Sequence, residues 1–167
     1  MCIRDSAHCL HLTETDWKIL RDNECSVAFC PSSNLFVGSG LFDLPRAQAV
    51  DVNLGIGTDV GAGTSLSILQ TISDAYKTQR LAGNDLSPFS ALYMATLGGA
   101  KSLDCEADIG NFKIGKEADF ILLDPESTPI MKYRTRHCKS LQEMLFGIAL
   151  LGDCLLYTSP SPRDLAQ

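Results

Sequence analysis

Asp59 is the residue best placed to do chemistry in this chain. It follows the apolar run 52–57 and precedes a loop of small residues, Val60-Gly-Ala-Gly63, that leads toward a helix. A carboxylate at the end of a parallel strand lies at the edge where α/β enzymes keep their catalytic groups. An Asp in front of a helix can also serve only as an N-cap, so the sequence leaves both interpretations open.

His8 is the second candidate. It stands in Ala7-His-Cys-Leu-His-Leu12, which we expect to be the end of another strand. If His8 and Asp59 end neighbouring parallel strands, an imidazole and a carboxylate meet at one edge, as in hydrolytic metal sites. A histidine at a strand end can instead be a structural hydrogen-bonding residue. His11 and His137 are expected to be capping or solvated residues, and neither is assigned a role.

Three strand–helix units are predicted to position these side chains. They pair strand 7–12 with helix 13–23, strand 26–30 with a helix from Pro45 to about residue 49, and strand 52–57 with a helix over 65–82. The loop 32–44 separates the second strand from its helix. Strand–helix units in tandem indicate a parallel α/β architecture.

The second half of the chain changes character. A further helix is predicted from Ser87 to about residue 103, with Gly98 and Gly99 allowing close approach of a neighbour. Two apolar runs within 109–124 flank the turn residues Gly115-Lys116, which predicts strands of a separate antiparallel sheet. A final helix is expected over 140–151, from its apolar residues at helical spacing.

Composition excludes several classes of protein. The chain has 167 residues and a formal net charge of -6, from 14 Lys and Arg against 20 Asp and Glu. The charges form no block, so neither nucleic acid nor a membrane is an expected partner. The longest apolar stretch, 145–151, is far shorter than the roughly 20 residues that span a bilayer. Seven cysteines without a CxxC pair predict reduced thiols in a cytoplasmic protein.

The two ends differ from the sequence between them. Residues 1–6 stop abruptly at the first motif, and residues 154–167 change composition directly after an apolar helix. Both resemble translated sequencing-adapter sequence, so we expect them to be non-native and leave them out of the fold prediction. On this interpretation the chain is a piece of a longer parent protein.

Five segments resemble the guanine deaminase branch of the amidohydrolase superfamily in order and spacing. They are Ala7-His-Cys-Leu-His-Leu12, Ala28-Phe-Cys-Pro-Ser-Ser-Asn34 with Gly38-Ser-Gly40, Gly55-Ile-Gly-Thr-Asp-Val-Gly-Ala-Gly63, Ala95-Thr-Leu-Gly-Gly-Ala100, and Ile109-Gly-Asn-Phe112 with Gly115-Lys-Glu-Ala-Asp119. The Thr-Asp pair marks the superfamily broadly, whereas the Phe-Cys-Pro-Ser-Ser-Asn segment is more particular to this branch. The resemblance covers nearly all of residues 7–153.

The resemblance implies an α/β fold with two parts. Residues 7–104 would be the C-terminal portion of a (β/α)8 barrel of the TIM type, about its last three strand–helix units. Residues 105–130 would be part of a small β-sandwich domain, and residues 131–153 a linker and a C-terminal helix.

The resemblance also implies a chemistry, the zinc-dependent release of ammonia from guanine to give xanthine. Asp59 corresponds to a metal ligand that also acts as a base, and one zinc ion is expected per parent subunit. His8 corresponds to a histidine that orients the attacking water and, in two-metal relatives, binds metal directly. Ser32, Ser33 and Asn34 fall in the segment that walls the purine pocket. Family likeness alone suggests a homodimer.

The remaining metal ligands of the family come from a His-x-His pair after the first barrel strand and a His-x-x-Glu motif after the fifth, and we expect neither of them in this chain. One carboxylate and one imidazole fall short of the about four ligands of a stable zinc site, so the chain alone is expected neither to hold zinc nor to turn over.

Two other functions stay open. One is a different amidohydrolase, an aminohydrolase or chlorohydrolase acting on a triazine or an adenosine-type substrate. The other is a non-catalytic module derived from the barrel. Asp59 argues against the module, because nothing structural demands a carboxylate at its position.

Overall fold

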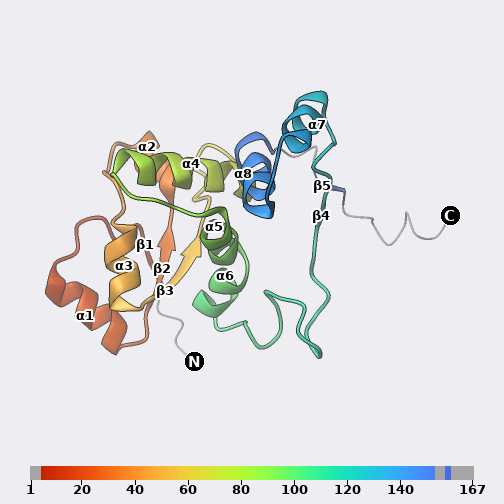
Figure 1. Ribbon diagram of the computed structural model, residues 1–167. Coiled ribbons are helices and arrows are strands. Elements are labelled where there is room, and N and C mark those ends of the chain that lie inside the picture. The colour runs from red at the N-terminus through yellow and green to blue at the C-terminus, as the bar shows by residue number, and fades with distance from the viewer. Residues whose placement is uncertain (1–4, 153–156, 159–167) are drawn as a thin grey trace.

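Three short parallel strands organise the chain (Figure 1). The computed structural model describes residues 5–152 and 157–158, in which β1 (Asp5–Ala7), β2 (Ser26–Phe29) and β3 (Asn53–Ile56) form one sheet in the order β1-β2-β3. Ser26 of the central strand lies opposite Asp5 on one side and Asn53 on the other, and both pairings are parallel. The expected α/β class with a parallel sheet is confirmed.

Helices follow each strand in the predicted alternation. These are α1 (Glu14–Asp22) after β1, α2 (Pro31–Phe36) and α3 (Leu44–Val50) after β2, and α4 (Ile68–Leu81) after β3, with α5 (Pro88–Ala95) and α6 (Leu97–Ser102) packing back against β3. Side-chain caps fix several of the helix starts. Thr13 forms a capping box with Asp16 before α1, and the Ser67 and Ser87 hydroxyls accept backbone N–H groups of α4 and α5.

Three predicted boundaries were wrong. The first strand ends at Ala7 rather than at residue 12, because His8 and Cys9 adopt left-handed φ angles of 68° and 49°. The loop 32–44 contains a helix, α2, which starts with Pro31 in its first turn. The helix expected over 87–103 breaks into α5 and α6 at Thr96, where φ is -128° and ψ is -100°.

Of the two apolar runs predicted as antiparallel strands within 109–124, the described chain forms a strand only at the end of the second. Between residues 105 and 121 the described chain makes turns, held in part by Lys116 Nζ, which donates to the carbonyls of Glu106 and Ile109. Only β4 (Leu122–Leu123) is a strand, and it pairs antiparallel with β5 (Tyr157–Thr158). Ile114 is fully exposed, so no other part of the described chain covers it, and a two-stranded hairpin alone is only marginally stable.

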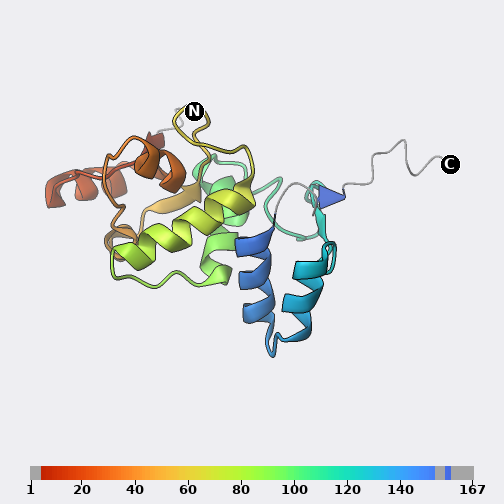
Figure 2. The same ribbon diagram turned by 90° about the horizontal axis from the view of Figure 1, so that it is seen from above.

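Two antiparallel helices follow β4. α7 (Pro129–Arg136), which the sequence reading missed, and α8 (Leu141–Leu151), which it predicted, lie side by side in Figure 2. The Tyr76 and Phe146 rings meet edge to face, with 4.7 Å between centroids, and this contact docks α8 against α4. Within the described residues, every helix is too short or too polar to cross a membrane.

An aromatic cluster forms the centre of the core. Phe29 of β2 stacks on Phe42 with 4.8 Å between ring centroids, and Trp17 of α1 meets Phe42 edge to face at 6.3 Å. The buried Gln79 amide donates to the Phe42 carbonyl, so the loop that carries this ring is also fixed by a polar bond. The core thus ties α1, the sheet and α4 together and holds the strand ends in place.

Gly98 lets α6 approach β3 closely, as the sequence predicted for the Gly98-Gly99 pair. A Cβ atom at Gly98 would stand 2.6 Å from the Leu54 carbonyl oxygen and 2.9 Å from that of Tyr93. Both of these atoms belong to the backbone and cannot rotate away. At Gly99 the nearest atom, the Met94 carbonyl oxygen, would lie 3.3 Å from the added Cβ.

We therefore expect Gly98→Ala to lower the free energy of unfolding by about 1–3 kcal/mol, because the helix must move away from β3. Gly99→Ala is the matched control and should change it by less than about 1 kcal/mol, since alanine favours the helix and the contact is milder. Urea unfolding of the chain, followed by Trp17 fluorescence, measures both. Equal losses in the two variants would contradict the close packing at Gly98.

Candidate active site

The parallel strands bring three reactive side chains to one edge of the sheet. His8 follows β1, Cys30 follows β2, and Asp59 lies three residues beyond β3. Because the strands run in the same direction, their carboxyl ends lie on one edge. The structure places His8 and Asp59 next to each other, as the sequence predicted.

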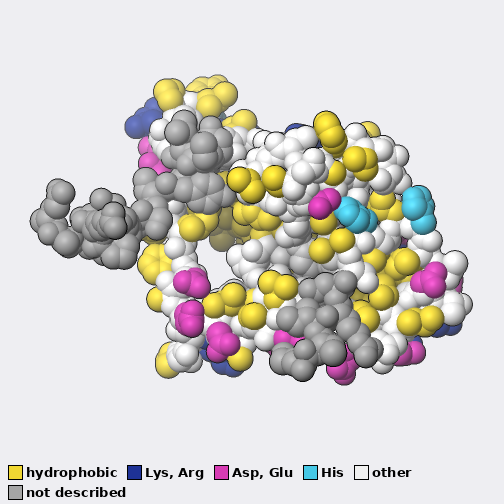
Figure 3. All heavy atoms as spheres, turned by 180° about the vertical axis from the view of Figure 1, so that it is seen from behind, with side chains coloured by type: hydrophobic (Ala, Val, Ile, Leu, Met, Phe, Trp, Pro, Cys, Tyr) yellow, Lys and Arg dark blue, Asp and Glu magenta, His cyan; other side chains and the backbone are white. Residues whose placement is uncertain are grey.

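His8 and Asp59 face each other at the surface. Their closest polar atoms, His8 Nε2 and Asp59 Oδ2, are 3.6 Å apart, and the two side chains are 42% and 41% exposed. This distance exceeds that of a good N–H···O hydrogen bond. Seen from behind in Figure 3, histidine side chains reach the surface, and an acidic side chain lies against one of them. The pair is therefore open to solvent and to a ligand between the two groups.

Unusual backbone conformations aim both side chains. His8 and Asp59 have φ angles of 68° and 46°, in the left-handed region that non-glycine residues enter at a cost. The turn after Asp59 is closed by a 2.6 Å hydrogen bond from the Gly63 N–H to the Asp59 carbonyl. A Cβ at Gly63 would collide with the Thr58 carbonyl, so this turn requires glycine.

The structure decides between the two interpretations of Asp59. Helix α4 starts at Ile68, and its N-cap is Ser67, whose hydroxyl accepts from the Gln70 N–H. Asp59 lies well before this helix and does not cap it. Its carboxylate faces His8 instead.

Helix α2 supports His8 from within the protein. The Nδ1 atom of His8 lies 2.7 Å from Oδ1 of Asn34, and Ser32 Oγ donates to Asp74 of α4 at 2.7 Å. Ser32, Ser33 and Asn34 are 6%, 1% and 2% exposed. They thus lie behind the histidine in this structure, and their predicted part in purine binding stays a prediction.

Cys30 completes the edge between the two outer strands. Burial, reinforced by the negative charge of Asp59, raises the pKa of its thiol to about 11, against an opposing hydrogen bond from the His8 backbone. Sequence reasoning placed Cys30 at the end of strand 26–30 and did not bring it next to Asp59. Its position next to Asp59 follows from the order β1-β2-β3, in which its strand is central.

One sequence pattern in the chain mimics a metal motif. His11-Leu-Thr-Glu14 has the letters His-x-x-Glu, but His11 Nε2 bonds the Ser39 carbonyl at 3.0 Å. Glu14 lies in the first turn of α1 and pairs with Arg46 of α3. His11 and Glu14 thus bind to different partners, and the assignment of no role to His11 stays a prediction.

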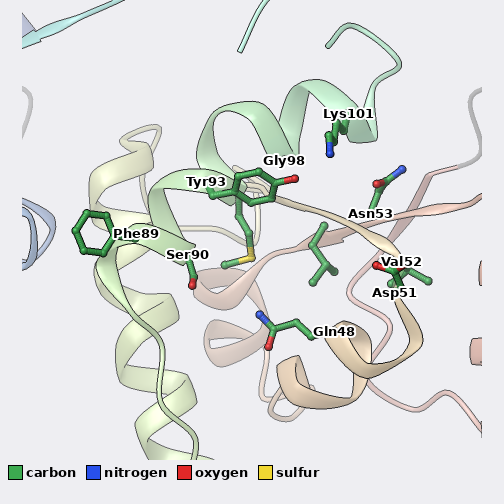
Figure 4. Close-up of a pocket in the computed structure, with 11 residues that line it drawn as sticks. Gln48, Asp51, Val52, Asn53, Phe89, Ser90, Tyr93, Gly98 and Lys101 are labelled. Carbon is green, nitrogen blue, oxygen red and sulfur yellow. The ribbon is translucent and has the colours of Figure 1, made fainter. Parts of the chain in front are cut away.

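A cavity beside the sheet lies at its other edge (Figure 4). A space of about 470 Å³ is walled by residues at the start of β3, including Asp51 and Asn53, and by α5 and α6, including Tyr93 and Lys101. Asp59 follows the opposite, carboxyl end of β3. Catalytic groups of α/β enzymes gather at carboxyl ends, so we do not assign this cavity to the site.

The donor atoms present fit part of a zinc site. Carboxylate oxygen and imidazole nitrogen are both zinc ligands, and two such ligands of one tetrahedral ion stand about 3.3 Å apart, close to the His8–Asp59 separation. Within the described ranges no three His, Cys, Asp or Glu side chains are grouped so that they could hold a metal ion. His8 and Asp59 thus match two positions of a zinc site and do not make a whole one.

Comparison with known proteins shows which proteins this chain is similar to. The chain is 50% identical over 147 residues to guanine deaminase of Escherichia coli (strain K12). The aligned region covers 88% of this chain and 34% of that protein. The structure of E. coli guanine deaminase matches with a TM-score of 0.90 at 48% identity, over 92% of this chain and 36% of that one. An adenosine deaminase from Xanthomonas campestris with bound zinc matches with a TM-score of 0.74 at 30% identity, over 84% and 32%.

The chain thus spans about a third of the length of the proteins that it matches. Residues 3–150 match the sequence pattern described as the amidohydrolase family. This match includes both strand ends of the candidate site and nearly all of the described helices. The chain belongs to the amidohydrolase family.

Proposed function

We propose that this chain is the C-terminal part of a guanine deaminase, which converts guanine and water to xanthine and ammonia. The observation that carries the proposal is the facing pair His8–Asp59 at the carboxyl edge of the sheet. On this proposal β1, β2 and β3 belong to a (β/α)8 barrel, and residues 105–130 to a small β-sandwich domain. The homodimer suggested by family likeness stays a prediction.

The proposed division of labour follows from the contacts. Asp59 takes the proton from the attacking water, because its carboxylate is exposed and faces the imidazole. His8 presents Nε2 on the same side and orients that water, while its other ring nitrogen is held by Asn34. Asp59, with His8 beside it, would hold a zinc ion in the parent protein, and that ion would supply the Lewis acidity that lowers the pKa of water toward neutrality. The remaining ligands would come from other parts of the parent protein.

The sequence identities to known deaminases favour guanine over other ring substrates. The chain is 50% identical to the E. coli guanine deaminase and 37% identical, over 131 residues, to a 5-methylthioadenosine/S-adenosylhomocysteine deaminase of Moorella thermoacetica. Adenosine-type and triazine substrates therefore remain the alternatives to exclude. A non-catalytic module is disfavoured, because both polar side chains stay exposed at the strand ends.

The function is tested by placing residues 7–153 in full-length E. coli guanine deaminase, in place of the aligned segment. We expect this chimera to release ammonia from guanine, and to release neither ammonia from adenosine nor chloride from atrazine. Asp59→Ala should lower the rate by about 100-fold or more, because the base is lost. The 167-residue chain alone should show no release above background.

Asp51→Ala is the matched control for this experiment. Asp51 also has a left-handed backbone, with φ of 64°, but it lies at the opposite end of β3. Replacing Asp51 by alanine changes the backbone strain at a left-handed residue in a similar way. The rate of ammonia release should stay within about twofold of that of the unsubstituted chimera. Full activity of Asp59→Ala, or equal losses in both variants, would contradict the catalytic assignment.

The alkylation rate of the Cys30 thiol reports the charge of Asp59. The negative charge of Asp59 raises the pKa of the Cys30 thiol, so Asp59→Asn should lower that pKa. A larger fraction of Cys30 is then thiolate at pH 9, and its alkylation should become about twofold faster or more. Iodoacetamide labelling of the chain, followed by peptide mass spectrometry, gives the rate. Cys105 in the same sample and the variant Asp51→Asn serve as controls, and both should show unchanged rates. A Cys30 rate that does not respond would mean that Asp59 does not act on the thiol.

A further inference from the structure

We propose that Asn34 is a positioning residue that fixes the tautomer of His8, with the proton on Nδ1 and the lone pair of Nε2 directed to the site. The two atoms that carry this inference are His8 Nδ1 and Asn34 Oδ1, at 2.7 Å. A carbonyl oxygen can only accept a hydrogen bond. The nitrogen that faces it must therefore carry the proton, and the neutral ring then has its lone pair on Nε2.

The position of Nε2 makes this tautomer useful. This atom lies 3.6 Å from Asp59 Oδ2, on the exposed side of the ring. An unprotonated nitrogen there can accept a hydrogen bond from water or bind a metal ion, whereas a protonated one can do neither. A second residue that fixes the ring is the usual way in which proteins prepare a histidine for such a task.

Asn34 is itself held so that it can perform this role. It is 2% exposed, and its helix α2 is fastened to α4 by the bond from Ser32 to Asp74. Asp74 also accepts from Gln70 and Lys77, so the anchor is a network on α4 rather than a single contact. The amide group therefore has little freedom to turn away from the ring.

The amide nitrogen of Asn34 supplies an independent observation. Among the described residues, Nδ2 of Asn34 is buried and has no hydrogen-bond partner. A buried amide that served stability alone would have both of its ends paired. Here one end is unpaired while the other bonds to His8, so the side chain is placed for the histidine. Its earlier assignment to the purine wall would require contact with substrate instead.

The test uses the 167-residue chain labelled with ¹⁵N-histidine. Long-range ¹H–¹⁵N spectra, recorded where the ring is neutral, show which ring nitrogen of His8 is protonated, and His8→Gln assigns the signals. We expect a protonated Nδ1. In Asn34→Leu, which has no acceptor, the proton should move to Nε2, the form that a free imidazole in water favours. Asn34→Asp retains an acceptor oxygen and should keep Nδ1 protonated.

Leu35→Ala is the control on the same helix, because Leu35 is 43% exposed and makes no bond to His8. It should leave the His8 signals unchanged. A protonated Nε2 and bare Nδ1 in the unmodified chain would overturn the proposal even if Asn34→Leu failed to fold. An unchanged tautomer in a folded Asn34→Leu variant would also overturn it.

The catalytic consequence rests on the proposed function and is measured separately. In the chimera, Asn34→Leu should lower kcat for guanine by about 10- to 100-fold with little change in KM, as expected when a supporting residue is lost. A rise in KM with an unchanged tautomer would instead identify Asn34 as a substrate contact. An inactive chimera with the expected tautomer would refute the deaminase proposal and leave the role of Asn34 standing.

Discussion

The parallel register of β1, β2 and β3 is the constraint on which the candidate site depends. It sets the carboxyl ends of three strands on one edge, so that His8, Cys30 and Asp59 become neighbours although they are distant in sequence. A slip of β1 by one residue against β2 would turn its side chains to the opposite face. The aromatic cluster around Phe29 and the close approach of α6 at Gly98 hold β2 and β3 in place, so packing away from this edge supports two of the three strands.

Helix α2 shows that part of this chain is not optimised for stability. Its first turn buries two hydroxyl groups and an amide, and both Ser33 Oγ and Asn34 Nδ2 lack partners within the described residues. Each such group costs about 1–3 kcal/mol. Apolar residues would fill this space more favourably. The polar composition is explained by the two bonds that α2 does make, one that anchors it to Asp74 and one that holds His8.

The backbone at the edge carries a second cost. His8, Cys9 and Asp59 all have left-handed conformations, which cost about 1–3 kcal/mol each in residues other than glycine. These conformations end the strands sharply and turn the two side chains toward each other. Between them the Cys30 thiol, whose pKa is raised, stays neutral near physiological pH. The negative charge at this edge is therefore confined to the carboxylate, which a cation can approach from solvent.

The sequence predicted most features that depend on local interactions and missed several that depend on contacts between residues distant in the chain. Local signals sufficed for α4 and α8, where a serine cap and helical spacing agree, and for polar residues that directly follow apolar strands. The apolar runs around Gly115 predicted two strands, of which the described chain forms only β4, because a strand also needs a surface to pack against and Ile114 is fully exposed. The bond between His8 and Asn34 could not be predicted from spacing. It depends on a left-handed turn at one residue and a six-residue polar helix at the other, and neither leaves a periodic pattern in the sequence.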